Sequence, residues 1–137
     1  MSQRVKIKSP TNRCFWIGLL SKLSSTDFQY AFKTNKPNID KFINLLQENN
    51  THTDFVKWQN SFLSSNELNQ NFTHIRDFNK NTINQGYLCS SCDPFLLLIT
   101  HLFHIELVHK YCGHSIIYTV KNPRKTLNYF SNSHHFW

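Results

Sequence analysis

The sequence predicts one α+β domain over residues 1–137, with a helical N-terminal part packed on a small antiparallel sheet from the C-terminal third. Apolar residues recur at helical spacing through the first half of the chain, and three segments rich in β-branched and aromatic residues lie near its end. A length of 137 residues is enough for one domain with its own core and too short for two ordinary domains.

The helical part consists of separate amphipathic stripes. The first begins at Cys14 or its neighbour and continues through Trp16, Leu19 and Leu23. Further stripes follow at Ile39–Leu46, Phe55–Phe62 and Leu68–Ile75. Clusters of Asn and Ser separate the stripes and predict caps and turns, because their short polar side chains bond to nearby backbone groups.

The last third of the chain predicts one buried helix and three strands. Asp93-Pro94 is an expected N-cap with proline at the first helical position, and the helix behind it should end near Phe103. The expected strands are Ile105–Tyr111, Ser115–Val120 and Thr126–Phe130. Short turns between them predict an antiparallel meander.

Composition excludes several classes of protein. Only three glycines are present, so the sequence has neither a P-loop nor a dinucleotide-binding fingerprint, and no cofactor is expected. The longest apolar stretch, Pro94–Val108, falls short of the roughly 20 residues that a membrane span needs. No secretory signal is expected at the N-terminus, and four cysteines are too few for a disulfide scaffold, so the sequence predicts a cytoplasmic protein.

The net charge of +7 is a feature that many nucleic-acid-binding proteins share, so binding of nucleic acid has to be considered. Lys121, Arg124 and Lys125 lie beside Tyr129 and Phe130, but the other basic residues are spread along the chain without a dense cluster. The sequence therefore favours protein partners over nucleic acid.

Residues near the two ends of the chain carry the candidate chemistry. Cys14 follows a predicted turn and begins a helix, and backbone amides and the helix dipole at such a position favour the thiolate. At the other end, His134 and His135 follow the last predicted strand. A histidine carried on that strand is a candidate base for the thiol. Taken singly, a lone cysteine is more often a small buried apolar residue, and terminal histidines are more often exposed.

These features together resemble the ovarian tumour (OTU) family of cysteine proteases, and the viral members most of all. Members of the family usually carry the nucleophile in the motif Asp-Gly-x-Cys followed by an aromatic residue or Leu. The corresponding segment of this chain is Thr11-Asn12-Arg13-Cys14-Phe15. Asn12 fills the glycine position and tolerates a left-handed backbone well. The catalytic histidine of the family directly precedes an aromatic residue, as His135 precedes Phe136.

The resemblance implies a papain-like fold and a role for each of these residues. Cys14 is the implied nucleophile and His135 the implied general base and acid, while backbone amides of Asn12, Arg13 and Cys14 would hold the oxyanion. Trp137 stands where many members carry an Asp or Asn that orients the histidine. Asn132 is the candidate for that role here, and a Cys-His dyad is the alternative.

The implied reaction is hydrolysis of an isopeptide or peptide bond after the tail of ubiquitin or a ubiquitin-like modifier. Viral members of the family often also cut their own replicase polyprotein, so the resemblance implies such a polyprotein as a second substrate. It also implies that the protein is located in the cytoplasm of a host cell. A protein-binding relative without activity is a further alternative, because Thr11 and Trp137 depart from the family pattern.

The runner-up from a different class is a small basic nucleic-acid-binding protein that carries zinc. Its candidate ligands are Cys89 and Cys92, which form a C-x-x-C pair, together with Cys112 and His114. The competing interpretation places Cys89 and Cys92 in the packing around the start of the helix at Pro94.

Overall fold

Five α-helices lie within the residues that the computed structural model describes, which are 6–8, 14–85, 87–132 and 137. They are α1 (Cys14–Lys22), α2 (Ser25–Phe32), α3 (Ile39–Glu48), α4 (Ser65–Asp77) and α5 (Pro94–Phe103), with a 3-10 helix at Lys80–Gln85. Polar side chains start four of them: Ser24, Asn38, Ser64 and Asp93 are N-caps. The caps at Ser64 and Asp93 are predicted from the sequence, whereas those at Ser24 and Asn38 are not. The predicted start at Cys14 and the predicted end at Phe103 are confirmed.

A five-stranded sheet forms the second half of the architecture. Its strands are β2 (Lys57–Trp58), β3 (Ser61–Phe62), β5 (Glu106–Tyr111), β6 (His114–Thr119) and β7 (Thr126–Ser131), in the order β3-β2-β6-β5-β7. The pair β1 (Lys6–Lys8) and β4 (Leu88–Ser90), which the sequence analysis did not predict, forms a separate antiparallel ribbon. The described part of the chain is thus a small α+β domain.

The expected antiparallel meander is wrong in one connection. β5 and β6 form an antiparallel hairpin, but β7 pairs with β5 in parallel, so the sheet is mixed. The physical reason lies in residues 121–125, which cross the start of β5: the N–H of Arg124 donates to the carbonyl of His104, and the N–H of Glu106 donates to that of Lys125, each at 2.9 Å. The chain therefore passes β5 before it returns as β7.

A helix predicted over Phe55–Phe62 is a β-hairpin instead. Gln59 and Asn60 have φ values of +50° and +69°, the left-handed backbone of a two-residue hairpin turn. Trp58 points inward, while Phe55 and Phe62 are exposed, so the apolar residues do not share one helical face. The sheet consequently extends beyond the C-terminal third of the chain.

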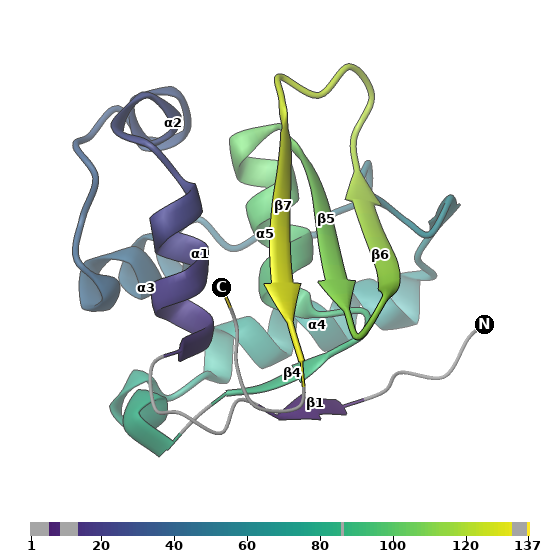
Figure 1. Ribbon diagram of the computed structural model, residues 1–137, viewed down its shortest axis with the longest axis horizontal. Coiled ribbons are helices and arrows are strands. Elements are labelled where there is room, and N and C mark those ends of the chain that lie inside the picture. Colours follow the sequence, from purple (N-terminus) through teal and green to yellow (C-terminus); the bar gives the residue numbers. More distant parts are fainter. Residues whose placement is uncertain (1–5, 9–13, 86, 133–136) are drawn as a thin grey trace.

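One face of the sheet holds the core. Along β5, Leu107 and His109 are buried, whereas Val108 is half-buried and Lys110 is exposed. Figure 1 shows α5 behind this face, α1 beside the β7 edge, and β5, β6 and β7 uncovered toward the viewer. The core is strongly aromatic and centres on Phe15 and Trp16 of α1, with Phe95 of α5 and Phe28 of α2 around them. No helix in the described ranges is long and apolar enough to cross a bilayer.

Candidate active site

Cys14 is the first residue of α1 and is 6% exposed. The start of a helix carries partial positive charge and backbone N–H groups without an intrahelical acceptor, which stabilise a thiolate and a developing oxyanion. The sequence predicts this position correctly. All four cysteines lie in the described residues, and all four are thiols rather than disulfides.

Tyr129 connects the last strand to the start of α1. Its hydroxyl donates a 2.7 Å hydrogen bond to the backbone carbonyl of Phe15, the residue next to Cys14. Burial raises the pKa of Tyr129, and negative charge on Cys89 and on Cys14 acts in the same direction, which places the Cys14 thiol in the same buried neighbourhood. A neutral tyrosine thus holds β7 against the predicted nucleophile.

The C-terminal end of β7 is held by a second set of contacts, with Trp137. The N–H of Phe130 donates to the carbonyl of Trp137, and the N–H of Trp137 donates back to the carbonyl of Phe130, both at 2.8 Å. The two rings stack with centroids 5.8 Å apart. Trp137 is therefore bound alongside β7, on the sheet edge that faces α1 (Figure 1).

Other predicted site residues fall in two groups. Asn132 is half-buried just after β7 and lines a hollow of about 290 Å³ together with Trp137 and Cys112. His135 and His134, the predicted oxyanion residues Asn12 and Arg13, and the positions Thr11 and Phe136 of the family pattern lie outside the described residues. The structure brings Cys14, Tyr129 and Trp137 to one edge of the sheet.

His109 is a buried polar residue near this region that the sequence analysis did not single out as a site residue. It lies on the inner face of β5, where its Nε2 is 2.6 Å from the Oγ of Ser131 and its ring lies 5.5 Å from that of Tyr129. Burial lowers the pKa of His109 to about 4, so its ring is neutral at pH 7. The period-2 spacing of Leu107, His109 and Tyr111, with the charged residues Glu106 and Lys110 on the other face of the strand, is the pattern that would have placed it inside.

The four candidate zinc ligands are not gathered into one site. Cys89 and Cys92 are buried around the start of α5, whereas Cys112 is exposed in the turn between β5 and β6 and His114 is exposed at the start of β6. Among the described residues, no three His, Cys, Asp or Glu side chains are grouped so that they could hold a metal ion. Cys89 and Cys92 instead pack in the core, as the competing interpretation expects.

A buried hydrogen-bond network surrounds the start of α5. Asp93 accepts from the hydroxyl of Tyr87 at 2.9 Å and from the backbone N–H groups of Ser90 and Phe95 at 3.1 and 3.0 Å. Burial raises the pKa of Asp93, and the hydrogen bonds from Ser90 and Tyr87 offset part of that rise. The network fixes β4 against the helix behind the sheet, so Asp93 acts as a cap.

Comparison of the chain with protein-family models, with curated proteins and with solved structures finds no match. The function is therefore argued from the residues and their geometry.

Proposed function

We propose that this protein is an OTU-like cysteine protease that hydrolyses isopeptide or peptide bonds after the tail of ubiquitin or a ubiquitin-like modifier. The observation that carries the proposal is the link between the two ends of the chain. Tyr129 binds the carbonyl of Phe15 beside Cys14, and Trp137, two residues after His135, binds Phe130 next to Tyr129. These contacts support the proposal that Cys14 and His135, a nucleophile and a base far apart in the sequence, act together.

The proposed reaction has two covalent steps. The Cys14 thiolate attacks the scissile carbonyl carbon, and amides of residues 12 to 14 hold the oxyanion that forms. His135 protonates the leaving amine, which departs and leaves a thioester on Cys14. Water, deprotonated by His135, then attacks the thioester, which releases the carboxylate and restores the thiol. Asn132 is the proposed residue that orients the imidazole.

The burial of Cys14 favours a particular substrate shape. A thiol that is 6% exposed is reached most easily by an extended acyl segment without bulky side chains. The glycine-rich tail of ubiquitin has this form, because glycine lacks a Cβ and permits close approach of backbone to protein. A viral polyprotein junction with small residues before the cleaved bond is the second proposed substrate, in the cytoplasm of a host cell.

The test is incubation of the protein with ubiquitin that carries an electrophilic C-terminus, followed by intact mass measurement. We expect a covalent adduct on wild type, no adduct on Cys14→Ala, and an adduct formed about 100-fold more slowly on His135→Ala, since general base catalysis supplies about that factor. Cys112→Ala is the matched control, because Cys112 is the exposed thiol and should not carry the adduct.

An adduct that persists in Cys14→Ala and disappears in Cys112→Ala would contradict the proposed nucleophile. A folded wild-type protein that forms no adduct and cleaves neither ubiquitin chains nor small-residue peptide junctions would contradict the proposed activity, and would favour the inactive protein-binding relative.

A further inference from the structure

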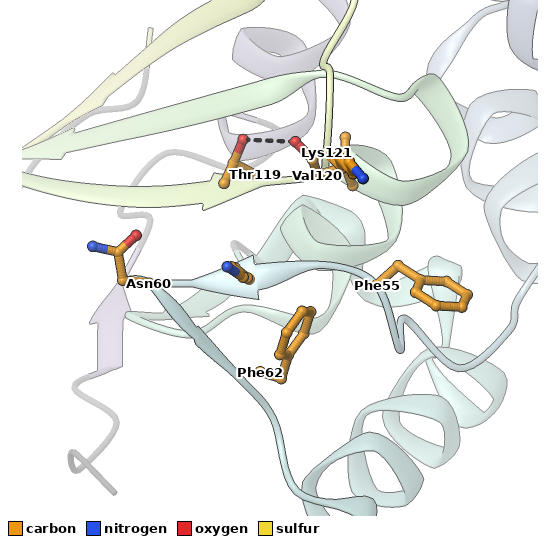
Figure 2. Close-up of a pocket in the computed structure, with 7 residues that line it drawn as sticks. Phe55, Asn60, Phe62, Thr119, Val120 and Lys121 are labelled. Carbon is orange, nitrogen blue, oxygen red and sulfur yellow. Dashed lines mark hydrogen bonds between the residues drawn. The ribbon is translucent and has the colours of Figure 1, made fainter.

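A hollow on the opposite edge of the sheet from Cys14 has no part in the proposed reaction. It has a volume of about 390 Å³ and lies between the loop before β2, strand β3 and the residues after β6. We call it the Phe55/Phe62 hollow. Its lining includes Phe55, Lys57, Asn60, Phe62, Val120 and Lys121 (Figure 2).

We propose that the Phe55/Phe62 hollow binds single-stranded nucleic acid, with bases stacked on the two phenylalanine rings and phosphates paired with Lys57 and Lys121. This inference does not depend on the proposed protease activity, because the hollow lies at the β3 edge of the sheet, whereas Cys14 is on α1, beside the opposite β7 edge (Figure 1).

Two aromatic rings are unusually accessible here. The side chains of Phe55 and Phe62 are 75% and 59% exposed, which makes them the most exposed large apolar residues in the described part of the chain. Figure 2 shows both rings on one side of the hollow, with Val120 and Lys121 across from them. Exposed rings beside an open hollow are the usual platform for unpaired bases, since every base has a flat face that can stack.

The sheet register places a cation against one of these rings. Lys57 pairs with Phe62 on one side and with Thr119 on the other, so the three side chains form a row on the open face of the sheet. The Lys57 ammonium lies 5.2 Å from the centre of the Phe62 ring. The ammonium thus covers one face of the Phe62 ring, so a base stacked on the other face would lie near a positive charge that a phosphate of the same strand could reach.

The charge of the hollow favours a polyanion over a second copy of the chain. Lys57 and Lys121 are the charged residues that line it, and no carboxylate is among its lining residues in the described part of the chain. A second copy would bring the same two lysines and a net charge of +7 against them, which is repulsive. A nucleic acid strand supplies a phosphate for each base, so one ligand satisfies both the rings and the cations.

The structure also explains why the sequence did not single out this surface. Of the basic run after β6, Arg124 and Lys125 pair with the buried carboxylate of Asp27 at 3.2 and 2.6 Å. That leaves Lys121 facing the hollow, where it meets residues some 60 positions earlier in the chain. The nucleic-acid surface proposed here is thus a different one from the Lys121–Lys125 segment beside Tyr129 and Phe130.

The experiment measures the fluorescence anisotropy of a labelled oligo-dT of twelve nucleotides as it is titrated with the full chain at several KCl concentrations. We expect Phe55→Ala and Phe62→Ala each to raise the Kd about 5-fold or more, because removal of one stacked ring has at least that effect. In Lys57→Gln with Lys121→Gln, the slope of log K against log salt should become shallower by about 0.7 for each phosphate that the protein no longer neutralises. Both phenylalanines are exposed, so their alanine variants should fold.

Matched controls separate this site from general attraction to a basic protein. Ile17→Ala removes an exposed apolar side chain elsewhere, and Lys36→Gln removes an exposed lysine elsewhere. Neither should change the Kd by more than about 2-fold at moderate salt. Cys14→Ala should bind the oligonucleotide like wild type, which keeps this outcome separate from that of the protease test.

Three results would overturn the proposal. The first is no measurable binding of the oligonucleotide at low salt. The second is binding that falls equally in Lys36→Gln and in the Lys57 and Lys121 variant, with no effect of either phenylalanine. The third is stronger competition by poly-glutamate than by unlabelled oligo-dT at equal charge, which would indicate an acidic protein partner instead.

Discussion

His109 illustrates how the position of a side chain on a strand sets its burial and its protonation state. It lies on the inner face of β5, bonded to Ser131 and next to the ring of Tyr129. Because burial penalises the charged imidazolium, the pKa of this histidine is lowered from 6.5 to about 4. The three residues form the buried side of the sheet edge that faces α1, so His109 supports the position of the strand that leads to Asn132.

The lowered pKa predicts a pH-dependent stability. An unfolded chain binds a proton at His109 below about pH 6.5, whereas the folded chain does so only near pH 4, so stability rises with pH across this window. We expect the wild-type unfolding free energy to fall by about 3 kcal/mol from this group between pH 7 and pH 4. Chemical denaturation at several pH values, compared with His109→Gln, measures the effect. Equal pH dependence in the two proteins would contradict it.

At the scale of elements, the turn of the β2–β3 hairpin determines how residues 55–62 fold and which of their side chains are exposed. Gln59 and Asn60 adopt positive φ, and the side chain of Gln59 accepts from the N–H of Ile117 at 3.0 Å. The turn thus folds β3 back onto β2, which pairs with β6, and exposes Phe62 at the sheet edge. A helix through the same residues would have removed the Phe55/Phe62 hollow.

A pair of substitutions at Asn60 tests this turn. Asn60→Val should lower the unfolding free energy by about 1–2 kcal/mol, because a β-branched side chain is strained at a φ of +69°. Asn60→Gly should be neutral or stabilising, because glycine adopts this conformation without strain. Thermal unfolding of both variants checks the difference. Equal melting temperatures would show that the turn does not require a left-handed residue.

At the scale of the whole molecule, Tyr118 connects three parts of the fold. Its hydroxyl accepts from the N–H of Asp93 at 2.9 Å and donates to the carbonyl of Ser91 at 3.0 Å. The indole N–H of Trp58 donates to the same carbonyl at 2.8 Å. The network joins β2 and β6 of the sheet to the segment between β4 and α5, so it holds the sheet against the helix behind it.

Removal of the Tyr118 hydroxyl tests how much this network contributes to the stability of the fold. We expect Tyr118→Phe to lower the unfolding free energy by about 1–3 kcal/mol, because the N–H of Asp93 is then buried without its acceptor. Tyr111→Phe is the control, since Tyr111 is half-buried in the same sheet. Its effect should stay within about 0.5 kcal/mol in denaturant unfolding. Equal losses in the two variants would contradict the role of the network.

The sequence predicts well those features that depend on local chemistry. The start of α1 at Cys14, the Asp93 cap with Pro94 behind it, and the three C-terminal strands follow from spacing and capping, which act within a few residues. The assignment of Cys14 and His135 to catalysis rests on motif resemblance, and it stays a prediction.

Only the tertiary structure decided how the strands are ordered and what lies between them. The parallel pairing of β7 with β5 depends on contacts of residues 121–125 with the start of β5, and the Phe55/Phe62 hollow depends on pairing between residues about 60 positions apart. Neither leaves a local pattern, because periodicity reports which face of an element is apolar and not which element it meets. Local residue chemistry therefore determined most of the elements, the β2–β3 hairpin and the β1–β4 ribbon excepted, and long-range hydrogen bonds and packing determined which surfaces they form.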